Sequence, residues 1–198
     1  MLSDNEKTVL LKLARSALES CLDGRSIPQC RIAHKALLES KGAFVSLHSG
    51  EELRGCIGQL FPDRELYRIV QYCAVSAALE DTRFLPVAKE ELQDLNIEIS
   101  VLTPFRRIEK KIDVIEVGKH GLYITRGLSR GLLLPQVATQ YGWDRIAFLR
   151  HTCRKAGLPD SAWQDSQSVI HTFEAEVFSE PRLEESDLLP RFSRNGRS

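Results

Sequence analysis

The chain has 198 residues, of which 42% are hydrophobic, enough to bury one large core or the cores of two small lobes. Lysine plus arginine and aspartate plus glutamate each number 27, so the formal net charge is zero. A balanced charge gives no net field that attracts nucleic acid or an anionic membrane. Both are therefore disfavoured as partners.

Neither the N-terminus nor the cysteines point to export. Residues 1–6 lack the basic start of a signal peptide, and no apolar stretch is long enough to span a bilayer. The cysteines are odd in number and widely spaced, which is typical of reduced thiols and not of a disulfide framework. They are Cys21, Cys30, Cys56, Cys73 and Cys153. We expect a cytoplasmic protein.

The first part of the chain predicts a helix followed by a β-hairpin. Ser3 and Glu6 have the spacing of a capping box, and leucine and alanine then recur at helical spacing as far as Cys21. Two runs rich in apolar and β-branched residues, 43–47 and 53–60, flank a turn-forming Ser-Gly-Glu-Glu sequence. These runs predict the two strands of the hairpin.

A second helix and the clearest strand come next. Apolar residues between Leu66 and Ala78 follow the i, i+3, i+4, i+7 spacing without a break, which predicts a helix with a wide buried face. From Leu95 to Leu102 the period changes to two, with Glu98 on the polar side. Pro104 then ends the predicted strand.

The remaining elements are shorter. Glycines separate two apolar runs, 122–125 and 132–134, which predict a second hairpin. Pro135 opens a short helix, Asp144 caps another, and residues 169–178 predict a last strand.

This order of elements lacks the strict alternation of strand and helix that a doubly wound fold requires. It predicts an α+β protein with mainly antiparallel strands. Residues 1–180 are expected to form a single domain, in which two intertwined lobes are possible. Residues 181–198 show no periodicity and are expected to be a loosely packed C-terminal tail.

The segment Leu53-Arg54-Gly55-Cys56-Ile57-Gly58 is the most distinctive in the chain. Two closely spaced glycines in a strand indicate a bulge, close backbone packing, or a backbone that approaches a ligand. In an extended strand Arg54 and Cys56 project from one face, and a nearby guanidinium lowers the pKa of a thiol. Cys56 is thus a candidate nucleophile or ligand contact, and a small packing residue is the alternative.

Three further residues are candidates. His120 lies in a glycine-flanked turn before a strand, where an imidazole can act as acid or base for a cysteine. Glu98 can orient that histidine or bind a cationic group. Arg83, in Asp81-Thr82-Arg83, forms either a ligand clamp or a local contact with Asp81 that fixes a turn. Solvated side chains are the alternative for His120 and Glu98.

Several familiar motifs are absent from the sequence. It has no phosphate-binding glycine loop with its lysine, no dinucleotide fingerprint, no His-Glu-x-x-His and no Cys-x-x-Cys pair. We therefore expect no tightly bound metal ion or cofactor, and no iron–sulfur centre of the usual kind.

The string Leu-Arg-Gly-Cys-Ile-Gly at 53–58 resembles a motif of the AMMECR domain family, to which the bacterial AmmeMemoRadiSam system protein A belongs. Five further strings match in the expected order, at 42–47, 81–86, 97–102, 118–122 and 131–138. Together they cover about residues 40 to 178. The resemblance implies an α+β fold in two lobes, a barrel-like curved sheet flanked by helices, and a cleft at the Arg-Gly-Cys segment.

The resemblance also implies partners. It suggests a pathway shared with a Memo-like protein and a radical S-adenosylmethionine enzyme, and it names no reaction. Cys56, His120 and Glu98 are the candidate catalytic residues. The candidate ligand-binding residues are Arg54, Gly55, Gly58, Arg83 and Gln136.

Three functions remain open from the sequence. The first is an accessory or enzymatic component of that pathway, with a cleft that binds a small molecule or peptide. The second is a cysteine-dependent enzyme that uses Cys56 with His120. The third is an oligomeric scaffold, such as a homo-oligomer, or a regulatory factor without chemistry of its own.

Overall fold

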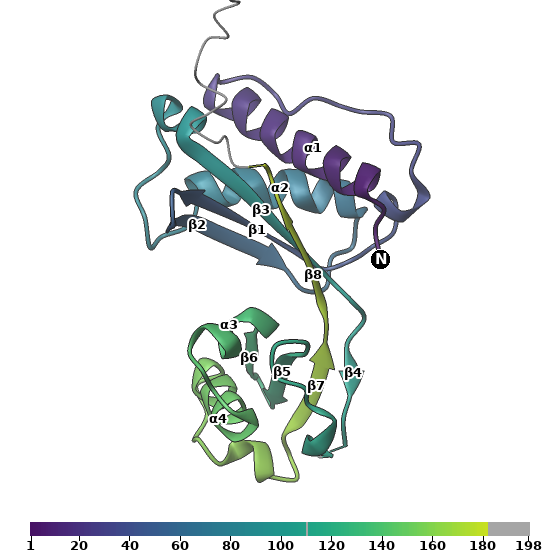
Figure 1. Cartoon of the computed structure of the whole chain (residues 1–198), viewed down its shortest axis with the longest axis vertical. Coiled ribbons are helices and arrows are strands. Elements are labelled where there is room, and N and C mark those ends of the chain that lie inside the picture. The colour runs from purple at the N-terminus through teal and green to yellow at the C-terminus, as the bar shows by residue number, and fades with distance from the viewer. Residues whose placement is uncertain (110, 182–198) are drawn as a thin grey trace, which may run out of the picture.

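The computed structural model describes residues 1–109 and 111–181 and divides them between two lobes (Figure 1). The first lobe contains a four-stranded antiparallel sheet in the order β2-β1-β3-β8. Its strands are β1 (Ala43–Ser49), β2 (Glu52–Gln59), β3 (Leu95–Leu102) and β8 (Ala175–Ser179). The predicted first hairpin and the predicted strand at 95–102 are therefore confirmed.

Two long helices cover one face of this sheet (Figure 1). They are α1 (Asp4–Leu22) and α2 (Leu66–Leu79), and short 3-10 helices lie at Lys35–Leu37 and Lys89–Asp94. The predicted capping box is present, with the Ser3 hydroxyl and the Glu6 carboxylate each bound to the other's backbone amide. The core between helices and sheet is apolar, and it includes Cys73 at 0% exposure.

The second lobe has its own four-stranded antiparallel sheet in the order β4-β7-β5-β6. The strands are β4 (Arg106–Arg107), β5 (Gly121–Arg126), β6 (Ser129–Leu133) and β7 (Val169–Phe173). The helices are α3 (Pro135–Gln140) and α4 (Arg145–Lys155), with 3-10 turns at Ile112–Val114 and Ala162–Gln164. The side chain of Asp144 caps α4, as predicted.

The chain crosses between the lobes twice, after β3 and again between β7 and β8. The predicted single strand at 169–178 is divided at Glu174, and its two halves pair with different sheets. At the crossing the Glu174 amide donates to the Thr103 hydroxyl at 2.8 Å. The Thr103 amide donates to the Glu174 carbonyl at 2.9 Å. These bonds tie the two connecting segments together.

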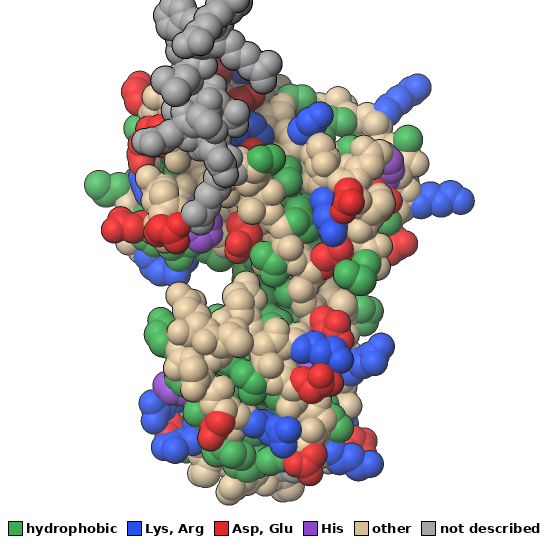
Figure 2. Space-filling model, viewed as in Figure 1, with side chains coloured by type: hydrophobic (Ala, Val, Ile, Leu, Met, Phe, Trp, Pro, Cys, Tyr) green, Lys and Arg blue, Asp and Glu red, His purple; other side chains and the backbone are tan. Residues whose placement is uncertain are grey.

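A cluster of apolar and aromatic side chains joins the lobes beside this crossing. Phe44 and Leu60 from the first lobe pack with Phe105, Tyr123 and Phe173 from the second. Phe61 also contacts the Phe105 and Tyr123 rings, although it is 65% exposed. Elsewhere the lobes are separated by a notch, which lies between the β2 and α3 regions (Figures 1 and 2).

The predicted α+β class with antiparallel pairing and two lobes is confirmed. Both sheets of the described residues are flanked by helices, and neither closes into a barrel. The predicted tail at 181–198 lies outside the described residues except for Pro181. Within the described ranges, no helix has the length and apolarity needed to cross a membrane.

Candidate functional site

The first sheet has one face that its helices do not cover. Along β1, and along β3 as far as Ile99, buried side chains alternate with half-buried ones, as expected for a sheet with a single packed face. We call the side of the sheet that carries the half-buried ones the open face; on this side Ser100 is buried, and Val177 and Ser179 are exposed. It consists of Phe44, Ser46 and His48, of Cys56 and Gly58, of Asn96, Glu98 and Ser100, and of Val177 and Ser179.

The register of the strands places four polar residues of the open face in one row. Cys56 lies opposite Ser46, Ser46 lies opposite Glu98, and Glu98 lies opposite Ser179. The neighbouring row contains Phe44, which belongs to the cluster between the lobes. The polar row therefore borders the junction and is on the side of the sheet that is turned to the second lobe (Figure 1).

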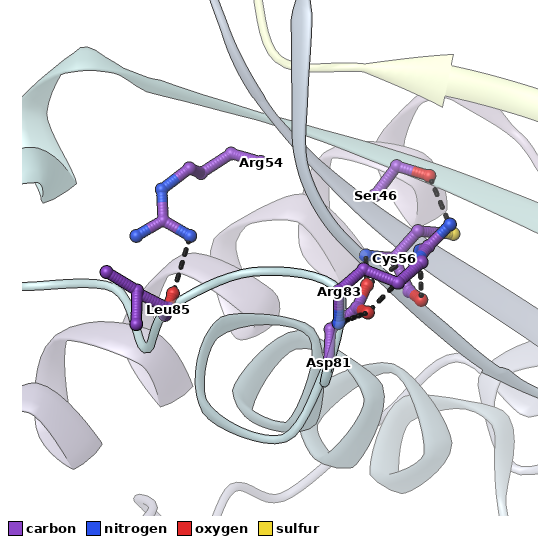
Figure 3. A network of polar contacts seen from close by, with 6 residues as sticks. All are labelled: Ser46, Arg54, Cys56, Asp81, Arg83 and Leu85. Atoms are coloured by element: carbon purple, nitrogen blue, oxygen red, sulfur yellow. Dashed lines mark hydrogen bonds and ion pairs between the residues drawn. The ribbon is translucent and has the colours of Figure 1, made fainter.

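Arg54 does not share this face with Cys56, so the expected activation of the thiol by Arg54 is wrong. The pairing shifts between Leu47 and His48, which leaves Arg54 as an extra residue in β2, a β-bulge that breaks the alternation. Its guanidinium instead binds the Glu91 carboxylate at 2.8 and 3.0 Å and the carbonyl of Leu85 at 2.8 Å. Arg54 thus fastens the 85–91 segment to the strand, pointing away from Cys56 (Figure 3).

The arginine beside Cys56 is Arg83. The Asp81 carboxylate accepts the Cys56 amide at 2.8 Å, and Arg83 donates to the Cys56 carbonyl at 3.3 Å (Figure 3). Asp81 and Arg83 also bind each other through two nitrogens of the guanidinium, at 2.9 and 2.6 Å. Because β2 is an edge strand, these contacts satisfy backbone groups that have no neighbouring strand. The arrangement matches the local contact that fixes a turn.

The Cys56 thiol is half-buried and receives a hydrogen bond of 3.3 Å from the Ser46 hydroxyl. Burial raises the pKa of this thiol above its ordinary value. The bond from Ser46 and the charge of Arg83 act in the opposite direction with less effect, and the charges of Asp81 and Glu98 add to the increase. Cys56 is therefore a protonated thiol at neutral pH, which is a poor nucleophile.

Glu98 presents a free charge on the open face. Its side chain is half-buried and makes no hydrogen bond or ion pair with another described residue. The Nε2 atom of His48, on the same face, is also buried without a hydrogen-bond partner among the described residues. The carboxylate oxygens of Glu98 are not among the buried atoms that lack a partner, so they stay accessible to a donor or a cation from outside the chain.

The two glycines of the Arg-Gly-Cys segment have packing roles. A Cβ atom added at Gly55 would lie 2.1 Å from the carbonyl oxygen of Ala77, in the last turns of α2. One added at Gly58 would lie 2.2 Å from the Phe44 ring. Close packing therefore explains both residues without a ligand.

The structure does not bring His120 to Cys56. His120 lies in the second lobe, where its Nδ1 atom accepts the Glu116 amide at 3.1 Å. Its Nε2 atom lies 3.9 Å from a carboxylate oxygen of Glu174. Gln136 is on α3, the helix on the other side of the notch from β2. Of the candidate catalytic residues, only Cys56 and Glu98 lie in one row.

Sequence reasoning missed two residues of this region, Ser46 and His48, and the contact of Asp81 with the Cys56 backbone. The alternation along 43–47 was the available signal for Ser46, because the hairpin register places it opposite Cys56. The other two depend on tertiary packing. Across the described part of the chain, no group of three or more His, Cys, Asp or Glu side chains is placed to hold a metal ion.

Comparison with known proteins gives the chain a family. The model of the AMMECR1 family matches residues 11–178. A protein from Methanosarcina acetivorans is 43% identical over 93% of this chain and 96% of its own length. One from Methanothermobacter thermautotrophicus is 42% identical over 90% of this chain and 96% of its own.

A solved structure resembles this fold closely. The uncharacterized protein PH0010 from Pyrococcus horikoshii superposes with a TM-score of 0.81 at 40% identity, over 87% of this chain and 90% of that one. The fold, the near full-length matches and the family model agree, and the chain belongs to the AMMECR1 family.

Proposed function

We propose that this protein is a binding module whose open face holds a positively charged group of a small molecule or peptide. The observation that carries the proposal is the Glu98 carboxylate, which is half-buried and has no partner among the described residues. A cationic ligand group would give that carboxylate a charge-assisted hydrogen bond. Ser46 and Cys56, in the same row, would supply further polar contacts.

The same geometry argues against cysteine catalysis. A nucleophilic cysteine needs a base within hydrogen-bond reach and a stabilised thiolate. Cys56 instead has Ser46 as its hydrogen-bond partner and a raised pKa, and His120 lies in the other lobe, in the turn before β5. We therefore assign Cys56 to ligand contact and not to attack on a substrate.

A matched pair of probes tests the proposed cation site. We would titrate the ¹⁵N-labelled full chain with butylguanidinium and with butylurea, a neutral molecule of similar shape, and follow the amide resonances. Butylguanidinium is expected to shift the Ser46, Cys56 and Glu98 amides and to bind about tenfold more tightly than butylurea. Glu98→Gln should remove that preference.

Two controls make the titration decisive. Glu19→Gln removes an exposed carboxylate from α1 on the helical side of the lobe, and should leave binding unchanged. Cys56→Ser should retain binding, because a hydroxyl can replace the contact of the thiol. If Glu98→Gln binds butylguanidinium as well as the unmodified chain does, the proposal is wrong.

We further propose the accessory role that the family resemblance implies, alongside a Memo-like protein and a radical S-adenosylmethionine enzyme. In this role the open face would hold a basic segment of the radical enzyme. Biolayer interferometry with both proteins from the same organism measures the association. Glu98→Lys should weaken it at least about tenfold, and Glu19→Lys should not. Equal binding by the two variants would remove the open face from this role.

A further inference from the structure

We propose that the second lobe carries a separate site for the anionic group of a small metabolite. The site is a pocket of about 360 Å³ beside the edge strand β4. Its walls come from β4, from residues 108, 109, 111 and 114 after β4, and from the turn that holds His120. The pocket is on the other sheet from Glu98, so this inference does not depend on the proposed cation site.

Unpaired cations surround the pocket. Arg106, Arg107 and Lys111 line it, and their charged side chains make no ion pair or hydrogen bond with another described residue. Of the nearby acids, Asp113 is paired with Arg145 and Glu116 with Lys119. Glu109 is the only carboxylate among the lining residues. The pocket therefore has an excess of positive charge that an anion would neutralise.

His120 supplies a donor at the same pocket. Its Nδ1 atom accepts the Glu116 amide at 3.1 Å, so the proton of the neutral ring is on Nε2. The nearest carboxylate oxygen lies 3.9 Å from Nε2, beyond hydrogen-bond distance. The ring is held in place by its backbone contact, and its N–H remains available to an anion.

The size of the pocket indicates an organic ligand. A volume of about 360 Å³ is within the range of small-molecule sites and exceeds what a bare phosphate or carboxylate fills. Ile108 and Val114 add apolar surface for the remainder of the molecule. At the rim, Glu109 has a φ of 37°, the one positive φ of a non-glycine residue in the described ranges. Such conformations concentrate at ligand sites.

Amide resonances of the full chain test the site directly. Phenyl phosphate, benzoate and inorganic phosphate are titrated separately at millimolar concentration. One of the two organic anions is expected to shift the amides of Arg106, Arg107, Lys111 and His120, and to bind more tightly than inorganic phosphate. The organic anion that binds more tightly shows whether the site prefers a phosphate or a carboxylate group.

Matched variants separate specific binding from general charge. Arg106→Gln combined with Lys111→Gln should weaken binding about tenfold or more. Arg130→Gln removes an exposed arginine from β6, at the opposite edge of the same sheet, whose side chain has no partner among the described residues, and should have no effect. His120→Asn keeps an acceptor for the Glu116 amide but lacks the Nε2 donor, and should weaken binding several-fold.

Three results would overturn the inference. They are the absence of shifts with every probe, equal weakening by Arg130→Gln and the pocket variant, and binding of inorganic phosphate as tight as that of either organic anion. The last would exclude a metabolite. A failure here leaves the Glu98 titration unaffected, because the two sites use different probes and different lobes.

Discussion

The carboxylate of Asp81 accepts a hydrogen bond of 2.8 Å from the backbone amide of Cys56, 25 positions earlier in the chain. The same carboxylate holds Arg83, which donates to the carbonyl of Cys56. The contact closes the free edge of β2 at Cys56. The turn that follows α2 thus determines where the Cys56 backbone lies.

Asp81→Asn is expected to destabilise the first lobe by about 2 kcal/mol, since it removes the charge from a carboxylate that is 5% exposed and accepts from two residues. Urea unfolding measures the loss. Arg83 is 58% exposed, so solvent screens its part of the pair. Asp63→Asn, at an exposed carboxylate paired with Arg64, is the control and should leave stability unchanged.

The pH dependence of stability follows from the same contact. The bonds from Arg83 and from the Cys56 amide hold the pKa of Asp81 well below its ordinary value. Stabilisation is therefore fully present above the unfolded-state pKa of about 3.9, and is lost as the pH falls through the lower folded-state value. In Asp81→Asn the free energy of unfolding should therefore fall less steeply as the pH is lowered below about 4. An unchanged dependence on acid pH would contradict this contact.

Gly55→Ala is expected to cost about 3 kcal/mol or to prevent folding, because the added Cβ meets the backbone oxygen of Ala77. Gly58→Ala should cost less, since the atoms that it meets belong to the Phe44 side chain, which can shift by a change of χ1, and not to the backbone. Gly50→Ala, in the turn between β1 and β2, meets no atom but has a φ of 60°, and should cost about 1 kcal/mol. Equal losses at the three positions would argue against close packing at Gly55.

Arg83, and not Arg54, should influence the pKa of the Cys56 thiol. Arg83→Gln is expected to raise the thiol pKa further, because it removes the one positive charge that lowers it. Arg54→Gln should loosen the 85–91 segment and leave the thiol pKa unchanged, because its guanidinium is bound to Glu91. The pH at which Cys56 becomes reactive to iodoacetamide reports both. If the thiol pKa shifts in Arg54→Gln but not in Arg83→Gln, the assignment of Arg83 as the arginine that acts on the thiol is wrong.

Most of the fold was predictable because its elements carry local signals. The capping box of α1, the wide apolar face of α2 and the period-two pattern of β3 each specify their element without reference to the rest of the chain. The division at Glu174 was not predictable, since apolar residues continue on both sides of it and only the partner strands change. The two-residue β4 has no apolar pattern at all.

The candidate site was predictable only in part. The sequence identified Cys56 and Glu98, which lie in one row, but the row depends on strand order and register. The bulge at Arg54 turns that side chain away from the thiol, so that Arg83 is the nearby arginine. A glycine-rich segment does not by itself specify the position of a bulge. His120 was paired with Cys56 by chemical type alone, and the fold places it in the other lobe, in the turn before β5.

The most direct test of the account is the rate of Cys56 alkylation by iodoacetamide as a function of pH, measured by peptide mass spectrometry on the folded protein. Burial raises the pKa of this thiol, so we expect the midpoint of the rate to lie above the ordinary value of about 8.5. Cys73, whose pKa burial raises to about 12, should stay protected as an internal control. A Cys56 midpoint below about 7 would reveal a stabilised thiolate and contradict the assignment of Cys56 to ligand contact.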